Sequence, residues 1–411
     1  MNRRDFLRAS GALSALFGLG APLHAAAAAP GDRKFLFVFN SGGWDPTRVF
    51  ADAFDLPVDM ESTAQRAQVG DIPFVDHGDR PSVRAFFEAH ASRATVFNGM
   101  LVSSVAHEAC TRICMTGSTD EGRPDWGAML ASDQSGLLLP SLVVAGPSFA
   151  GPLGSQVIRT GQAGQLQDLI DGSSVRTSGG TLLGAEALTE VDAYLARRAA
   201  AAPRRTASET LVRDGYAGAL DQLGPLRGLN GELDLGNAFE FRGQTDLAVE
   251  ALSAGTSRCV TIAHGAGQWD SHAGNDGTQS FLFESLFAGL LHLMEQLQTT
   301  PGTNGGTLAE ETTVVVLSEM GRTPLKNGDD GKDHWPYTSA MVLSDAFVGN
   351  RVIGSFDSGY QGRDLDPASG DVFDGGESFT AQMFGATLLA SAGMDPLVNG
   401  LGASPITGVL S

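Results

Sequence analysis

The segment Lys34-Phe35-Leu36-Phe37-Val38-Phe39 is almost entirely apolar, and the motif Gly42-Gly43-Trp44-Asp45 follows it after two residues. Two further segments, 258–263 and 312–317, are apolar and rich in β-branched residues, and a polar motif follows each. Such near-continuous apolar runs are typical of strands buried on both faces of a parallel sheet. The sequence therefore predicts an α/β fold, with a mostly parallel sheet flanked by helices.

The polar motifs lie just beyond the expected carboxyl ends of these strands, where ligands bind in open α/β sheets. The second motif is Trp269-Asp270-Ser271-His272, and the third is Ser318-Glu319-Met320-Gly321-Arg322. A fourth, Lys332-Asp333-His334-Trp335, precedes a predicted strand at 339–343. Because strands distant in sequence can end side by side, we expect the ionisable side chains of all four motifs to converge at one edge of the sheet.

The spacing of Asp270 and His272 predicts a metal site. Residues two apart in an extended segment point the same way, so this carboxylate and imidazole can face one centre. Oxygen and nitrogen ligands together favour zinc, manganese or iron over calcium. The alternative is that Asp270 caps the following helix and His272 is a surface residue.

Glu319 and Arg322 share a face if the turn after their strand is helical. Glu319 would then be a metal ligand or a general base, and Arg322 a guanidinium for a phosphate or sulfate group. Alternatively, the two residues pair with each other. Asp333 either binds the metal or orients His334, as carboxylates behind ligating histidines do.

His107 begins a predicted helix at 105–115 and is a third catalytic candidate, near Ser103, Ser104 and Thr111. A packing or helix-capping role is the alternative. The helix does not match a zinc-protease motif, because Thr111 stands where the second histidine is required. The remaining predicted elements are strands at 95–97 and 142–145 and helices at 81–94, 278–298 and 379–393.

Residues 1–29 are predicted to be a twin-arginine export signal. Arg3 and Arg4 precede an apolar stretch at 12–19, and small residues at 25–29 suit cleavage. The apolar stretch is too short to span a bilayer, so we expect no stable membrane anchor after cleavage, and a periplasmic or secreted protein. Residues 30–411 are predicted to form one domain, with a helical insertion at 183–223.

The formal net charge of −20 excludes nucleic acid and anionic lipid as expected partners. An anionic substrate would then need a local positive centre, either a metal or an arginine. Three cysteines do not make a disulfide framework.

Together, the leader, the four motifs and the helix around His107 resemble the bacterial family named domain of unknown function 1501. That family is similar to the alkaline phosphatase and sulfatase superfamily. The resemblance implies an alkaline phosphatase-like fold and a divalent metal, most simply zinc or manganese. It implies that Asp45 holds one metal, that Asp270 and His272 hold another, and that His334 completes the site.

The chain departs from that superfamily at the third motif, where Ser318-Glu319 replaces an Asp-His pair. The resemblance implies metal-dependent hydrolysis of a phosphate or sulfate ester, with an anionic ester or polysaccharide-type substrate. The alternative is a non-catalytic exported binding or assembly protein that keeps the fold. The nucleophile stays open among Ser103, Ser104, Thr111 and Thr116.

Overall fold

The structure is a computed structural model that describes residues 28–411 except 133, 135, 162–165, 168–183, 203–204, 230–232 and 234–239. The predicted export signal therefore lies almost entirely outside the described residues. Within them, no helix is both long enough and apolar enough to cross a membrane.

One main sheet organises the described part of the chain, and eight strands form it there in the order β12-β4-β11-β8-β1-β7-β5-β6. Only β11 runs antiparallel to the others, pairing with β4 and β8. The mostly parallel sheet is thus confirmed. The strand bounds are β1 (Lys34–Asn40), β4 (Ala94–Leu101), β5 (Ser141–Val143), β6 (Val157–Arg159), β7 (Cys259–His264), β8 (Thr312–Leu317), β11 (Tyr337–Leu343) and β12 (Arg351–Ile353).

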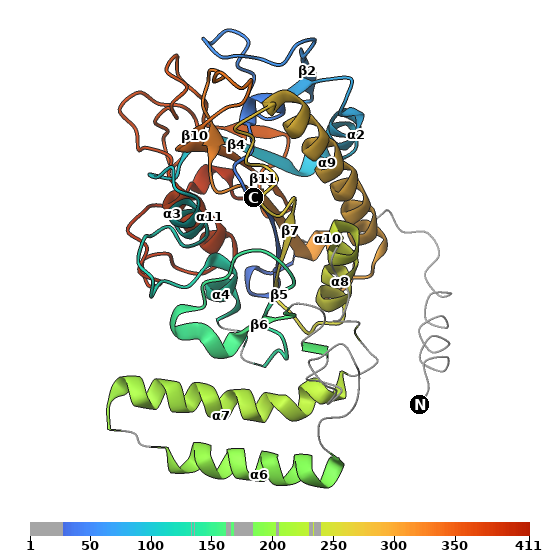
Figure 1. Cartoon of the computed structure of the whole chain (residues 1–411), viewed down its shortest axis with the longest axis vertical. Coiled ribbons are helices and arrows are strands. Elements are labelled where there is room, and N and C mark those ends of the chain that lie inside the picture. The colour runs from blue at the N-terminus through green and yellow to red at the C-terminus, as the bar shows by residue number, and fades with distance from the viewer. Residues whose placement is uncertain are drawn as a thin grey trace.

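Two hydrophobic cores lie on opposite faces of this sheet, because side chains of a strand alternate between faces. In β1, Leu36 and Val38 enter one core, whereas Phe35, Phe37 and Phe39 enter the other. Helices cover both faces (Figure 1). The first core packs α2 (Pro81–His90), α8 (Phe241–Ser253) and α9 (Asn275–Thr299), and the second packs α3 (His107–Thr116), α4 (Trp126–Ala131) and α11 (Ala381–Ser391).

The predicted helices are present with small shifts in their ends. The helix predicted at 81–94 ends at His90 and continues as a short 3-10 turn, Ala91–Arg93. The helix around His107 ends at Thr116, and Gly117 caps it. Gly117 has a φ of 69°, which glycine adopts easily because it has no Cβ. The apolar stripe of α9 is buried against the sheet from Leu282 to Leu297, with Leu291 half-buried.

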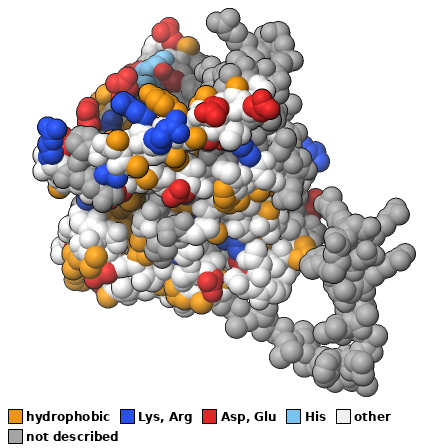
Figure 2. Space-filling view, turned by 90° about the horizontal axis from the view of Figure 1, so that it is seen from below, with side chains coloured by type: hydrophobic (Ala, Val, Ile, Leu, Met, Phe, Trp, Pro, Cys, Tyr) orange, Lys and Arg blue, Asp and Glu red, His pale blue; other side chains and the backbone are white. Residues whose placement is uncertain are grey.

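Within the predicted insertion, α6 (Ala185–Ala201) and α7 (Ala207–Gly228) form a helical pair that lies below the sheet in Figure 1. Figure 2 shows charged side chains of both signs scattered among hydrophobic ones on the face seen from below. Several apolar side chains of the pair are exposed, namely Val191, Tyr194, Leu211, Val212 and Tyr216. The division into a single domain with an insertion stays a prediction.

Smaller elements complete the described structure. Two two-stranded ribbons form, one from β2 and β3 and the other from β9 and β10. Their bounds, with those of the remaining helix and 3-10 turns, are β2 (Gln65–Val69), β3 (Ile72–Asp76), β9 (Gly321–Arg322), β10 (His334–Trp335), α10 (Leu308–Glu311), η1 (Pro30–Asp32), η2 (Pro46–Arg48), η4 (Gly151–Gln156) and η6 (Thr407–Val409).

His264, the last residue of β7, gives the fold a defined pH dependence. Its ring packs against Phe241 and Trp269, and burial lowers its pKa to about 4. An unfolded histidine has a pKa of about 6.5, so below that pH the unfolded state binds the proton more readily. We expect the free energy of unfolding to fall by about 3 kcal/mol as the pH drops from 6.5 to 4.

Chemical denaturation between pH 6.5 and 4 measures this fall in the free energy of unfolding. We expect the fall to be smaller in His264→Gln. His292→Gln is the control, since His292 pairs with Asp246 on a helix instead of packing among aromatic rings. An unchanged slope in His264→Gln would contradict the assignment.

Candidate metal centre

The four motifs meet at one edge of the sheet. The carboxyl ends of the parallel strands β1, β7 and β8 lie there, as does the amino end of the antiparallel β11. β4 ends at the same edge and leads into α3, which begins at His107. The structure therefore brings together Asp270, His272, Glu319 and His334 as expected, and adds His107 to them.

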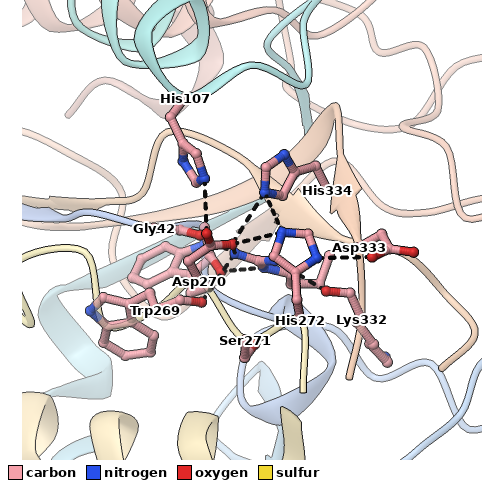
Figure 3. A network of polar contacts seen from close by, with 12 residues as sticks. Gly42, His107, Trp269, Asp270, Ser271, His272, Lys332, Asp333 and His334 are labelled. Atoms are coloured by element: carbon pink, nitrogen blue, oxygen red, sulfur yellow. Dashed lines mark hydrogen bonds and ion pairs between the residues drawn. The ribbon is translucent and has the colours of Figure 1, made fainter. Parts of the chain in front are cut away.

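Asp270 is at the centre of this group (Figure 3). Its Oδ1 accepts a hydrogen bond of 2.6 Å from Arg322 and lies 3.1 Å from Nε2 of both His272 and His334. Its Oδ2 lies 3.3 Å from Nε2 of His107. Burial alone would raise the pKa of Asp270, but Arg322 outweighs it and lowers the pKa to about 2. Asp270 is therefore ionised at neutral pH.

Each of the three histidines is held by an acceptor at Nδ1. His107 Nδ1 lies 2.9 Å from Glu319 Oε1, His272 Nδ1 lies 2.9 Å from Asp333 Oδ1, and His334 Nδ1 lies 2.7 Å from the Val105 carbonyl. A carbonyl or an ionised carboxylate can only accept, so each Nδ1 carries the proton. In a neutral ring, Nε2 is then left with a bare lone pair.

When the rings are neutral, the three Nε2 atoms turn lone pairs toward Asp270. His272 Nε2 and His334 Nε2 are 3.0 Å apart, and in two neutral rings that both carry the proton on Nδ1 neither has a proton for the other. Protonating one ring would let it donate to Asp270, but the second Nε2 would still face it. A cation among these atoms removes the conflict. Zinc bonds of about 2.0–2.1 Å place tetrahedral ligands about 3.3 Å apart, close to the spacings found here.

The donor set thus fits a divalent transition metal. One ligand atom from each of His107, Asp270 and His334 lies within 4.8 Å of the others, and His272 adjoins them. The side chains of His107 and His272 are 37% and 47% exposed, so solvent reaches the group. Hydrogen bonding to Glu319 raises the pKa of His107, and hydrogen bonding from His272 lowers the pKa of Asp333. Asp333 was expected to bind the metal or to orient His334, but its carboxylate faces Nδ1 of His272, so it orients His272 instead. The Val105 carbonyl holds His334.

Arg322 does not have the role expected of it. It is fully buried, and Nε, NH1 and NH2 bind the carbonyls of Gly43, Lys332, Gly42 and Trp269 as well as Asp270. A guanidinium enclosed in this way cannot clamp a phosphate or sulfate group. It positions Asp270 and the loop after β1. The alternative, an ion pair with Glu319, is not formed either.

Glu319 is also fully buried, which corrects its expected role as a general base. Its Oε1 accepts the Gly42 backbone N–H at 2.7 Å as well as facing His107 Nδ1. It acts on the candidate centre through His107.

Asp45 is fully buried and has no hydrogen bond or ion pair with these histidines. Its carboxylate accepts hydrogen bonds from Thr47 and Asn275 and lies 3.0 Å from Lys332 Nζ and 3.3 Å from Arg48. Burial would raise the pKa of Asp45, yet Lys332 and Arg48 hold it well below the usual range. Internal cations take the position that a metal would need, so we do not retain Asp45 as a metal ligand.

Sequence reasoning missed Lys332 and Gln279. Lys332 was visible within its motif, but nothing in the sequence pairs it with Asp45. Gln279, on α9, binds the backbone N–H of Asp45 and the carbonyl of Trp269. No local pattern marks a buried glutamine of this kind.

Residues 227–364 match the family model described as "Protein of unknown function (DUF1501)". The match spans less than half of the chain, and it includes Asp270 and His334 but not Asp45 or His107. No match was found among curated proteins.

Several solved structures are similar to the chain, including the following two. One is BT4656 in complex with its substrate D-glucosamine-2-N,6-O-disulfate, with 10% identity, a TM-score of 0.35 and coverage of 91% of this chain and 81% of that chain. The other is the phosphonate monoester hydrolase of Agrobacterium radiobacter, with 12% identity, a TM-score of 0.33 and coverage of 91% and 78%. Likeness at this level assigns no activity to this chain.

Replacing Arg322 tests its buried role. Arg322→Lys removes the planar set of donors and leaves several buried carbonyls and Asp270 without partners, so we expect it to lower the free energy of unfolding by about 3–5 kcal/mol. Arg66→Lys is the control, because Arg66 pairs with Asp52 and Asp55 at the surface, where such pairs contribute about 0–1 kcal/mol. Denaturant titration measures the free energy of unfolding of both variants. Equal losses of this free energy would contradict a stabilising role for the buried contacts of Arg322.

Proposed function

We propose that His107, Asp270, His272 and His334 hold a divalent transition metal, zinc or manganese, and that the chain is an exported metal-dependent hydrolase of phosphate or sulfate esters. The observation that carries the metal site is the placement of three histidine Nε2 atoms within 3.3 Å of one carboxylate, with each Nδ1 held by an acceptor. The motif resemblance supports the choice of ester hydrolysis. The paired arginines at residues 3 and 4 support export to the periplasm or beyond.

In this proposal each residue has a limited task. Asp270 supplies an anionic ligand, and Arg322 fixes its orientation from the buried side. Glu319, Asp333 and the Val105 carbonyl fix the three rings, as acceptors behind ligating histidines do. A metal bound there supplies a Lewis acid for ester oxygens and lowers the pKa of water.

One set of observations favours a second candidate, a non-catalytic exported binding or assembly protein. Arg322 offers no free donor to an anionic ester. In the described structure, the hydroxyls of Ser103, Ser104, Thr111 and Thr116 make no hydrogen bond to the histidine group, so no nucleophile is placed. Metal content and turnover separate the two candidates.

Metal binding is the first test. We expect the purified protein to bind close to one equivalent of zinc or manganese and to unfold at a higher temperature when it is loaded. His334→Ala should lose the metal while keeping the fold, because its ring lies outside both hydrophobic cores. His292→Ala is the matched control and should bind as the wild type does.

Metal analysis and calorimetry give the readout, and a panel of aryl phosphates and sulfates tests turnover. Wild-type protein that neither contains metal nor gains stability from added zinc would refute the metal site. Metal binding without turnover on the panel would favour the binding protein.

Glu319→Gln tests the support of His107. The glutamine can still accept the Gly42 N–H, but it no longer places a carboxylate against His107 Nδ1. We expect metal affinity to fall by about 10–100-fold with little change in stability, as for other residues behind a ligand. Zinc competition with a chelator measures this, with Glu284→Gln as control, since Glu284 binds Ser82 instead. Unchanged affinity would show that Glu319 is only structural.

A further inference from the structure

Two fully buried arginines, Arg48 and Arg80, lie close together away from the histidine group. Arg48 ends the short 3-10 helix η2 (Pro46–Arg48), and Arg80 is the residue before α2. They are 32 positions apart in the chain, and the metal proposal uses neither of them.

Helix α9 holds both guanidinium groups against one of its faces. Asp276 binds NH2 of Arg48 at 2.7 Å, and Ser280 accepts a hydrogen bond from NH1 of Arg80. Residues four apart are neighbours on a helix surface, about 6 Å apart along the axis. On their other side, the Asp59 carbonyl accepts from Arg48 and the Glu61 carboxylate accepts from Arg80. The two groups are therefore neighbours.

Each guanidinium uses a single nitrogen in these contacts. Nε and NH1 of Arg48, and Nε and NH2 of Arg80, are buried and have no hydrogen-bond acceptor among the described residues. Neither group lies over an aromatic ring in that part of the chain. A guanidinium stays charged and can only donate, so these nitrogens need an acceptor. A buried donor without one destabilises the folded protein.

The nearby carboxylates do not supply that acceptor. Asp276 also binds Lys326, Asp45 also binds Lys332, and Glu61 faces NH1 of Arg80. Two adjacent buried cations with unused donors form a setting that favours a small anion over a neutral ligand.

We propose that Arg80 binds one small inorganic anion, of the chloride type, through its unused Nε and NH2, which share one edge of the guanidinium, and that the neighbouring Arg48 contributes one of its unused nitrogens. The anion joins the loop after β1, the segment at 59–61, the start of α2 and α9 into one unit. This inference does not depend on the metal site, because it uses none of the histidines.

The probe is chloride, compared with gluconate at equal ionic strength, because gluconate is too large for a buried position. We expect chloride to raise the Tm of the wild-type protein saturably, by about 4 °C. In Arg80→Lys, the ammonium can still face Glu61 but lacks the unused nitrogens, so the saturable response should disappear. Arg84→Lys, an exposed arginine on α2 paired with Asp76, should respond as the wild type does.

Location is tested separately, on wild-type crystals grown with bromide. An anomalous peak between the two guanidinium groups, together with the chloride response, supports the site. Ordered water on the unused nitrogens without a peak overturns it. A peak without any response of Tm to chloride means an adventitious ion only, and also overturns it. The crystal measurement keeps the proposal testable if Arg80→Lys does not fold.

Discussion

The buried guanidinium of Arg322 joins loops that come from three parts of the chain. It binds carbonyls of the loop after β1, of the loop after β7 and of the segment before β10, and it reaches Asp270 with the same nitrogen that binds Gly42 and Trp269. Carbonyls and a carboxylate can only accept, and a guanidinium can only donate. The carboxyl edge of the sheet therefore takes a single arrangement around this one side chain.

The close packing around Arg322 explains the two glycines of the first motif. Gly43 has a φ of 85°, and a Cβ there would lie 2.7 Å from the Met320 side chain and 3.3 Å from Arg322. At Gly42, a Cβ would lie 2.5 Å from the backbone nitrogen of Asp270. The backbone must approach this closely for its carbonyls to reach the guanidinium. The Gly42–Asp45 motif, which suggested ligand binding in the sequence, therefore helps to hold Asp270 in position.

The sequence predicted the strands and their common edge because both follow from local patterns. Buried strands give apolar runs, and parallel strands end on the same side. The partners of each charge could not be predicted in this way. Asp45 and Asp270 follow strands in similar motifs, yet one meets Lys332 and the other meets three histidines. Lys332 is 287 residues from Asp45, and His107 and His334 are 163 and 64 residues from Asp270, so no local spacing encodes these pairings. Only His272, two residues from Asp270, could be paired with it from spacing.

The contrast between these two carboxylates decides where a metal fits. Asp45 is completely buried, and two internal cations and several neutral donors already satisfy both of its oxygens. Asp270 has one internal cation and is 35% exposed. Its free side faces the Nε2 atoms of three imidazole rings. A carboxylate compensated by fixed charges gains nothing from a metal, whereas one surrounded by further lone pairs is stabilised by it. The electrostatic balance within the protein, and not the residue type alone, therefore favours Asp270 over Asp45 as a ligand of the proposed metal.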